Sequence, residues 1–552
     1  MNTAAVGRYL RTIRHLRPRQ AGWQVVHRLR RNRPGFRRAA VPERMPEIRW
    51  AGDVNVPSPP AGGAHHRASL LGGSLTFQNR TEAIGFPPDW GVAELPLLWR
   101  YHLHYHDFLW SLGFADARRV ALHWIERHGP GRGQVGWEPY PTSLRLANWC
   151  ALFLGRDRER TLADAVFAAA LWSSVREQAN HLQRRLEWHL LGNHLFENGV
   201  ALALAGSCFA HPQAASWLRT GVKVLERQLP EQVLADGGHF ERSPMYQQRI
   251  LHGLRMLAST RNGDLQQLVR PCIERVRAAL ANLCHPDGGI ALVNDSALEE
   301  DADRGDSSRH TAPEPPVGAF ALADSGYYGA RTADGHYVLC DAGPIGPDYQ
   351  PGHAHADLLS FELSLRGARV VVDSGVSTYE AGAMRDYCRS TRAHNTVEIE
   401  GQNQVEVWAA FRVGRRCAPR DVDWQELPDG FLLSARHGGY RHLPGRPTHA
   451  RTFRWHAAGR LDISDSVDST RPVRSVARVH FHPDCRIEEL DRDTCTVGTP
   501  VGRVRVDWSG WADAAEDDSV YCPRFGVEIP NPCLRFSSAV ASLRAAVRIA
   551  VR

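Results

Sequence analysis

The chain has 552 residues, more than one hydrophobic core usually serves, so its length predicts two or more domains. Hydrophobic residues make up 43% of the sequence and charged residues 23%, with 16 tryptophans, and this composition excludes a disordered or fibrous protein. The net charge of +7 comes mostly from arginine, and no acidic residue precedes Glu43, so the charge favours an anionic partner.

The N-terminal sequence and the cysteines bear on the cellular compartment. The first residues are basic throughout and lack the continuous apolar stretch of a secretion signal. No run of about eighteen apolar residues occurs, so a membrane-spanning helix is not expected. The eleven cysteines form no CxxC pair, which is typical of buried thiols in a reducing setting. These features predict a cytoplasmic or inner-membrane-associated protein, with a periplasmic location as the alternative.

The first predicted unit is a basic N-terminal arm, residues 1–60. Tyr9 and Ile13, and then Trp23 and Val26, follow one another at roughly helical spacing among arginines. Two interpretations stay open. The arm is either a short helical segment folded onto the body of the protein or a basic amphipathic helix that contacts a membrane surface or a polyanion.

Two larger domains follow in the sequence. Residues 61–298 predict a helical domain, because apolar residues recur at helical spacing between short Gly, Pro or Asp breaks. Residues 299–317 are charged and proline-rich, which predicts a linker or an exposed loop. Residues 318–552 contain short alternating runs separated by Gly, Asp and Pro, which predict an antiparallel β-sandwich. Helices first and strands afterwards indicate an α+β multidomain protein with segregated domains.

Polar residues in the helical half gather where helices are expected to begin or end. The stretch "GNHLFENG" holds Asn193, His194 and Glu197, and "DGGHFERSPMYQQ" holds His239, Glu241, Arg242 and Tyr246. Each residue alone has a structural interpretation, as a helix cap, a satisfied core group or a ring with a bonded hydroxyl. Their functional interpretation depends on the wider context.

In the β half, "GHAHADLLSFEL" places His353 and His355 two residues apart, so they share a face if the strand is regular there. Further along, Asp373 is suited to bonding a turn and His394 to bonding a backbone carbonyl. The stretch "HPDGGIALVNDS", which contains Asp295, is expected to form a structural turn.

Six motifs in one order resemble the heparinase II/III family of polysaccharide lyases. They are "NHLFENGVALALAG", "DGGHFERSPMYQQ", "HPDGGIALVNDS", "GHAHADLLSFEL", "VVDSGVSTY" and "RDYCRSTRAHNTVEIEGQNQ". The resemblance covers roughly Leu98 to Trp408. It implies an incomplete (α/α) toroid followed by an antiparallel β-sandwich, the same order that the periodicity predicts.

The resemblance also implies a reaction, β-elimination at C4 of a uronic acid unit, which leaves an unsaturated sugar. Asn193 and His194 match the residues that bind the uronate carboxylate, and Glu197, one helical turn from Asn193, is expected to orient them. Tyr246 matches the catalytic tyrosine and His353 the second proton-transfer residue. In a glucuronate the C5 proton and the C4 oxygen share a face, which suits Tyr246 alone. In an iduronate or guluronate they lie on opposite faces, which suits His353 as base and Tyr246 as acid.

Further residues are expected to contact the substrate or a metal. The expected substrate contacts, beside Glu197, are His239, Glu241, Arg242 and Arg392, the last from an arginine-rich stretch that also holds Arg385 and Arg389 and is equally suited to internal salt bridges. His355, Asp373 and His394 match positions that hold a structural zinc ion in some family members, where the ion would fix the loop bearing His353.

The predicted partner is an acidic polysaccharide, with no nucleic acid and no organic cofactor, and the predicted role is processing or clearing of the cell's own exopolysaccharide. Two alternatives from other classes stay open. One is a non-catalytic polysaccharide-binding protein of exopolysaccharide processing, and the other is a metal-dependent glycan hydrolase that uses His355, Asp373 and His394. The polymer and the oligomeric state are not predicted.

Overall fold

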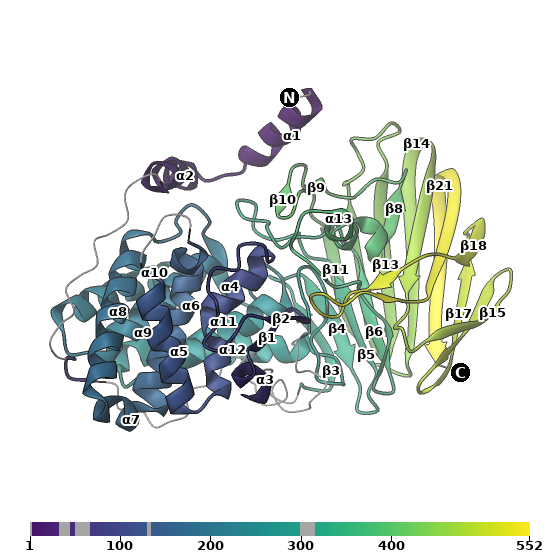
Figure 1. Ribbon diagram of the computed structural model, residues 1–552. Coiled ribbons are helices and arrows are strands. Elements are labelled where there is room, and N and C mark those ends of the chain that lie inside the picture. Colours follow the sequence, from purple (N-terminus) through teal and green to yellow (C-terminus); the bar gives the residue numbers. More distant parts are fainter. Residues whose placement is uncertain (1–2, 32–44, 50–66, 130–133, 299–314, 552) are drawn as a thin grey trace.

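The computed structural model describes residues 3–31, 45–49, 67–129, 134–298 and 315–551, and Figure 1 shows their arrangement. A helical domain and a β domain lie side by side. Two N-terminal helices lie on one side of this pair, at the top in the view of Figure 1. Of the predicted linker 299–317, residues 299–314 lie outside the described part of the chain.

The helical domain is a partial toroid of helices that follow one another in the sequence (Figure 1). Its helices are α3 (Arg67–Leu71), α4 (Leu97–Tyr105), α5 (Phe114–Arg127), α6 (Pro139–Trp149), α7 (Arg158–Ala163), α8 (Ala165–Arg184), α9 (Gly192–Cys208), α10 (Pro212–Gln232), α11 (Pro244–Ala258) and α12 (Gly263–Asn282). Shorter turns lie between them: η1 (Asp107–Ser111), η2 (Val135–Trp137) and the π-helical η3 (Cys150–Arg156). A hairpin that the sequence did not predict, β1 (Ser74–Phe77) with β2 (Arg80–Ala83), precedes α4.

The β domain consists of two antiparallel sheets. The smaller sheet has the order β3 (Gly318–Leu322), β4 (Tyr327–Arg331), β5 (Tyr337–Asp341), β6 (Phe361–Leu365), β7 (Ala368–Val371). The larger sheet has the order β11 (Arg420–Leu427), β12 (Gly430–His437), β13 (Thr448–His456), β14 (Arg460–His480), β21 (Cys533–Val551), β17 (Gly502–Ser509), β16 (Thr494–Thr499), β15 (Arg486–Leu490), with β8 (Val397–Ile399) on β14 and β18 (Asp513–Glu516) on β21. Short pairs are β9 (Val407–Trp408) with β10 (Arg412–Val413), and β19 (Val520–Tyr521) with β20 (Ile529–Pro530). One helix, α13 (Ala383–Cys388), and one turn, η5 (Thr391–Ala393), lie in the connections.

Each domain has its own hydrophobic core, as the patterns predicted. In the helical domain the fully buried tryptophans are Trp99, Trp124, Trp149, Trp172 and Trp217, which pack in one apolar cluster. In the β domain, β13 alternates strictly between buried and half-buried residues, because one face of its sheet packs on the smaller sheet. The expected α+β architecture, a toroid followed by a sandwich, is therefore confirmed.

The N-terminal arm forms two helices, α1 (Thr3–Ile13) and α2 (Pro18–Arg31). Both lie on the body of the protein, α2 beside the helical domain and α1 beside β9 and β10 (Figure 1). Among the described residues, no helix is long and apolar enough to cross a membrane.

Candidate active site

Three segments that are distant in the sequence meet at the junction of the two domains. Asn193 lies in the first turn of α9, Tyr246 in the first turn of α11, and His353 in the loop between β5 and β6. The ring centroids of Tyr246 and His353 are 3.9 Å apart, and His353 Nε2 lies 3.5 Å from Asn193 Nδ2. The Tyr246 hydroxyl lies 3.2 Å from that of Tyr379. An amide, a phenol and an imidazole therefore share one site.

The carboxylate of Glu241 fixes the start of α9. Asn193 donates to it from its backbone N–H at 2.8 Å and from Nδ2 at 3.0 and 3.2 Å. Gly192 makes this approach feasible, because its φ is +58° and a Cβ there would lie 2.5 Å from Glu241 Oε1. Glu241 Oε2 also lies 3.4 Å from His353 Nε2. Glu241, predicted to contact substrate, therefore positions two of the predicted catalytic residues.

A second carboxylate holds His194. Glu187 Oε1 lies 3.1 Å from His194 Nδ1, and Asn198 fixes Glu187 by donating to its Oε2 at 3.0 Å. Burial works against a charge on His194, but the Glu187 carboxylate outweighs it and raises the pKa of the imidazole. The His194 ring lies against Tyr140, with centroids 4.3 Å apart. This arrangement favours a protonated imidazole beside the site.

Asp295 lies at the centre of the site, although the sequence suggested only a structural turn. Its Oδ2 accepts from His353 Nδ1 at 2.9 Å, its Oδ1 accepts from His355 Nε2 at 2.9 Å, and the Arg385 guanidinium binds both oxygens. Burial opposes ionisation of Asp295, but Arg385 outweighs it and holds the pKa of the carboxyl well below its usual range. An ionised Asp295 requires a proton on His353 Nδ1 and another on His355 Nε2. In the neutral imidazole the lone pair of His353 is then on Nε2, which lies near Asn193 Nδ2 and Glu241 Oε2.

The predicted strand face for the two histidines is wrong, because β6 begins only at Phe361. His353 and His355 lie in a loop whose backbone is bonded to the segment around Asp295. Asp295 donates its N–H to the His353 carbonyl at 3.1 Å, and His355 donates its N–H to Asn294 Oδ1 at 3.0 Å. Both side chains reach one carboxylate because of this loop.

The three predicted metal ligands come together close to Asp295, which contacts both His353 and His355. One ligand atom each from His355, Asp373 and His394 lies within 4.8 Å of the others, and all three side chains are fully buried. His355 Nδ1 and His394 Nε2 have no hydrogen-bond partner among the described residues, and neither do the buried carboxylate oxygens of nearby Asp357. Unpartnered imidazole nitrogens beside carboxylates fit a divalent cation such as zinc.

Four of the predicted substrate contacts lie elsewhere or have other partners. The Arg242 guanidinium binds the carbonyls of Phe240, Asp324 and Ser325, and Arg392 is half exposed beside Asp517 at 3.6 Å. His239 Nε2 pairs with Gln232 Oε1 at 3.2 Å, and burial lowers the pKa of its imidazole to about 4. Glu197 is buried on α9, but Glu241 and Glu187, not Glu197, hold Asn193 and His194.

Sequence reasoning missed the groups that surround Tyr246. Arg249 lies one turn further along α11. Burial opposes the charge of Arg249, but Tyr140 and Glu197 outweigh the effect of burial and raise the pKa of the guanidinium. Arg249 is therefore a buried cation on the same helix as Tyr246. Burial and the neighbouring Tyr379 raise the pKa of Tyr246 well above its ordinary value. The signals were present, since Arg249 is three residues from Tyr246 and Tyr379 ends the motif "VVDSGVSTY".

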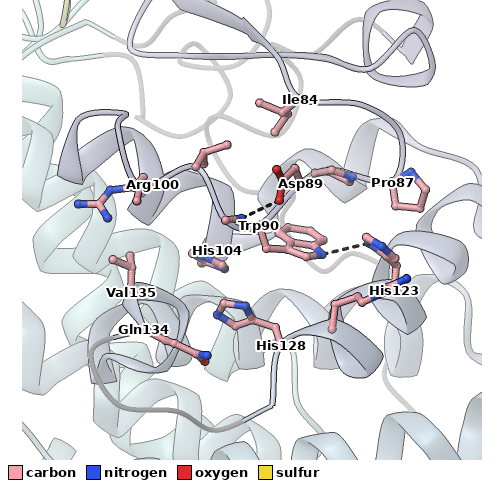
Figure 2. A pocket seen from close by; sticks show the side chains of 15 residues that line it. Ile84, Pro87, Asp89, Trp90, Arg100, His104, His123, His128, Gln134 and Val135 are labelled. Atoms are coloured by element: carbon pink, nitrogen blue, oxygen red, sulfur yellow. Dashed lines mark hydrogen bonds between the residues drawn. The ribbon is translucent and has the colours of Figure 1, made fainter.

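A cavity of about 640 Å³ lies within the helical domain, lined by residues that include Trp90, Arg100, His104, His123 and His128 (Figure 2). Trp90 Nε1 donates to His123 Nδ1 at 3.1 Å across it. None of the residues that line it belongs to the site around His353. The cavity and that site are therefore built from different side chains.

Two family profiles match the chain in succession. The profile "Heparinase II/III N-terminus" matches residues 105–311, and "Heparinase II/III-like, C-terminal" matches residues 314–549. Together they cover the helical domain from the end of α4 onward, nearly all of the β domain, and every residue of the site described above.

Curated relatives and solved structures are similar to the chain at low identity. A heparin-sulfate lyase of Pedobacter heparinus is 25% identical over 271 residues, which are 43% of this chain and 40% of the lyase, so the match spans less than half of that relative. The FtsZ-localized protein C of Caulobacter vibrioides is 26% identical over 465 residues, 76% of each chain. A crystal structure of heparinase III has a TM-score of 0.70 at 14% identity, covering 96% of this chain and 89% of that one. The structural match shows the shared fold.

Proposed function

The chain belongs to the heparinase II/III family, and from this premise we propose that it is a polysaccharide lyase acting on a uronic-acid-containing polysaccharide by β-elimination at C4. The observation that carries the proposal is the meeting of Asn193, Tyr246 and His353, which lie on three separate segments. A binding protein has no need for a phenol in contact with an imidazole whose tautomer a buried carboxylate sets.

The first step requires that the negative charge of the uronate carboxylate be neutralised, because the C5 proton beside it is very weakly acidic. His194, whose pKa Glu187 raises, supplies an imidazole donor, and Asn193 supplies an amide in the same turn of α9. Both groups are held by carboxylates before substrate arrives, so little reorganisation is needed as enolate charge develops.

The two proton transfers divide between His353 and Tyr246. With Asp295 on its Nδ1, His353 keeps a lone pair on Nε2 and is suited to remove the C5 proton. Tyr246 has a pKa raised well above its ordinary value by burial, so it carries its proton at neutral pH and is suited to protonate the departing C4 oxygen.

The contact between these rings bears on the uronate epimer. With centroids 3.9 Å apart, Tyr246 and His353 leave no room for a sugar ring between them. Base and acid therefore approach a bound sugar from one side, which suits a glucuronate-type unit whose C5 proton and C4 oxygen share a face. The sequence predicted His353 as the base for iduronate or guluronate, in which the C5 proton and the C4 oxygen lie on opposite faces. The contact between Tyr246 and His353 instead supports His353 as the base for a glucuronate-type unit.

We also propose that His355, Asp373 and His394 hold a divalent cation, with zinc as the first choice. Bound there, the ion would supply a fixed charge that orders the loop carrying His353. The complete burial of these three residues weakens the hydrolase alternative, since a metal beneath them would be out of reach of a substrate.

The experiment is an assay of unsaturated product ends by ultraviolet absorbance on a panel of uronate polymers, with and without sulfate groups. We expect release from at least one glucuronate polymer and almost none with Tyr246→Phe, which deletes only the hydroxyl. Folded protein that binds polymers and releases nothing would overturn the lyase proposal. Saturated product ends would support the hydrolase instead.

A non-catalytic role in assembly is the second candidate function. It is motivated by the match to FtsZ-localized protein C over 76% of each chain, because that protein is named for its localization and not for a lyase activity. The same assay separates the two, since the non-catalytic role predicts polymer binding without unsaturated products.

A further inference from the structure

The inner face of α1 is held to the β domain by polar contacts. Arg11 donates two hydrogen bonds to Glu406, from Nε at 2.7 Å and from Nη2 at 2.6 Å. Thr12 Oγ1 accepts from Trp408 Nε1 at 3.2 Å, and the Tyr9 ring meets the edge of Trp408 with centroids 5.0 Å apart.

Helix α2 is attached in a similar way, close to the predicted active site. Gln20 Nε2 donates to the Tyr349 carbonyl at 3.3 Å, and Gln24 Nε2 donates to the His189 carbonyl at 3.2 Å. Arg17 lies over the Tyr349 ring, 3.7 Å from its centroid. His189 lies just before α9, and Tyr349 lies in the loop that carries the predicted base. The arm thus contacts two of the three segments that carry the site.

The outer faces of these helices are apolar. On α1, Val6, Leu10 and Ile13 follow at intervals of four and three residues and are 40%, 57% and 50% exposed. On α2, Val25 and Leu29 are four residues apart and are 59% and 65% exposed. Helical geometry places each set on one stripe. The stripe of α1 faces away from Arg11 and Thr12 and runs next to Tyr9, and the stripe of α2 faces away from Gln20 and Gln24.

This arrangement is the reverse of an ordinary surface helix, which buries its apolar stripe and exposes its polar one. Of the sixteen large hydrophobic side chains exposed in the described part of the chain, six lie in α1 and α2. Apolar side chains gathered on one exposed surface mark a binding site rather than the scattered exposure found on any protein. The outer stripes are therefore candidates for an interaction surface.

Charge identifies the chemistry of that partner. No acidic residue precedes Glu43, while exposed Arg14 and Arg28 lie beside the stripes. Apolar stripes flanked by arginines fit the interface of a bilayer with anionic headgroups, where the side chains enter the acyl boundary and the guanidinium groups bind phosphate.

We propose that α1 and α2 form a docking surface for an anionic lipid bilayer. Both helices lie on one side of the molecule (Figure 1). A protein docked in this way holds segments that carry the predicted site next to the membrane. The docking itself does not depend on the lyase activity, so the two proposals fail separately.

The test is sedimentation of the full chain with vesicles of phosphatidylcholine alone or mixed in equal parts with phosphatidylglycerol. We expect binding to the mixed vesicles, little to the neutral ones, and weaker binding as salt rises. The variant Leu10→Glu/Leu29→Glu should reduce binding by about tenfold or more, because each change removes apolar area and adds a repelled charge.

The matched control is Leu162→Glu/Val166→Glu, which alters two residues of the helical domain that are 47% and 75% exposed. This control should bind vesicles like the wild type, and the thermal unfolding midpoint should be unchanged in both variants. Equal binding by the arm variant, or no binding by the wild type, would overturn the proposal. So would a wild-type dimer that Leu10→Glu/Leu29→Glu converts to monomer, since a second copy would then cover the stripes.

Discussion

Replacing Asp295 by Asn tests the central carboxylate of the site. The carboxylate accepts from four directions, because each oxygen binds one Arg385 nitrogen and one histidine, His353 or His355. An amide of the same shape has one acceptor oxygen and an NH₂ group. The NH₂ group must face a donor, whichever way the side chain is turned.

Two magnitudes follow from this geometry. The buried Arg385 loses its counter-ion, and breaking such a pair from one side costs roughly 3–5 kcal/mol of unfolding free energy. If the NH₂ group faces His353 Nδ1, the proton moves to Nε2 and the base is lost. Removal of the carboxylate that orients a catalytic histidine has lowered turnover by about four orders of magnitude in serine proteases, and a loss of about that size is expected here.

The assay compares the lyase rate and the urea unfolding curve of Asp295→Asn with those of Asp287→Asn. Asp287 also binds an arginine twice, Arg369 at 2.7 and 3.2 Å, but it contacts no residue of the proposed catalytic site. We expect Asp287→Asn to lower stability and leave the rate unchanged, and Asp295→Asn to lower both. A rate near that of the wild type in folded Asp295→Asn would refute the role given to this carboxylate.

The other predictions concern single groups. Asn193→Ala should raise the barrier to turnover by about 3 kcal/mol and weaken polymer binding far less, and an unchanged rate would remove the amide from the mechanism. His353→Ala should abolish cleavage of a glucuronate polymer, whereas retained cleavage would mean that Tyr246 acts alone. His394→Ala should lower bound divalent metal and the unfolding midpoint together, and a metal-free wild type of full stability would refute the cation site. Burial raises the pKa of Glu197 from 4.5 to about 7, so the folded state retains a proton that the unfolded state loses and stability falls as pH rises between these values. Glu197→Gln should flatten this fall, by about 3 kcal/mol at most, in urea unfolding at a series of pH values.

The sequence predicted the architecture because both domains follow local periodicity. In the helices from α4 onward apolar residues recur at helical spacing, and in strands such as β13 buried and half-buried residues alternate. Each period therefore indicates which face of the element is buried. The hairpin of β1 and β2 escaped prediction because each strand has only four residues and β2 buries little, which leaves no period to detect.

The site was predictable where a motif carried it and not where a long-range partner defines it. Asn193, Tyr246 and His353 were named from motifs, and the structure brings them together. Asp295 was given a structural role because its function depends on partners that are distant in the sequence. These are Arg385, ninety residues away, and two histidines in a loop that the sequence predicted to be a strand. Short-range patterns contain no information on such contacts.

The arginines also show that proximity in the sequence does not predict contacts in the site. Arg242 and Arg392 were chosen because they lie near motif residues in the sequence, yet the backbone conformation at Arg242, with φ of 57°, directs it to carbonyls of another turn. Arg249 was passed over although helical geometry places it one turn from Tyr246 on α11. In a site assembled at helix starts, position on the helix is a better guide than proximity in the chain. By that criterion Arg249 is the arginine to associate with Tyr246, which is among the groups that raise the pKa of its guanidinium.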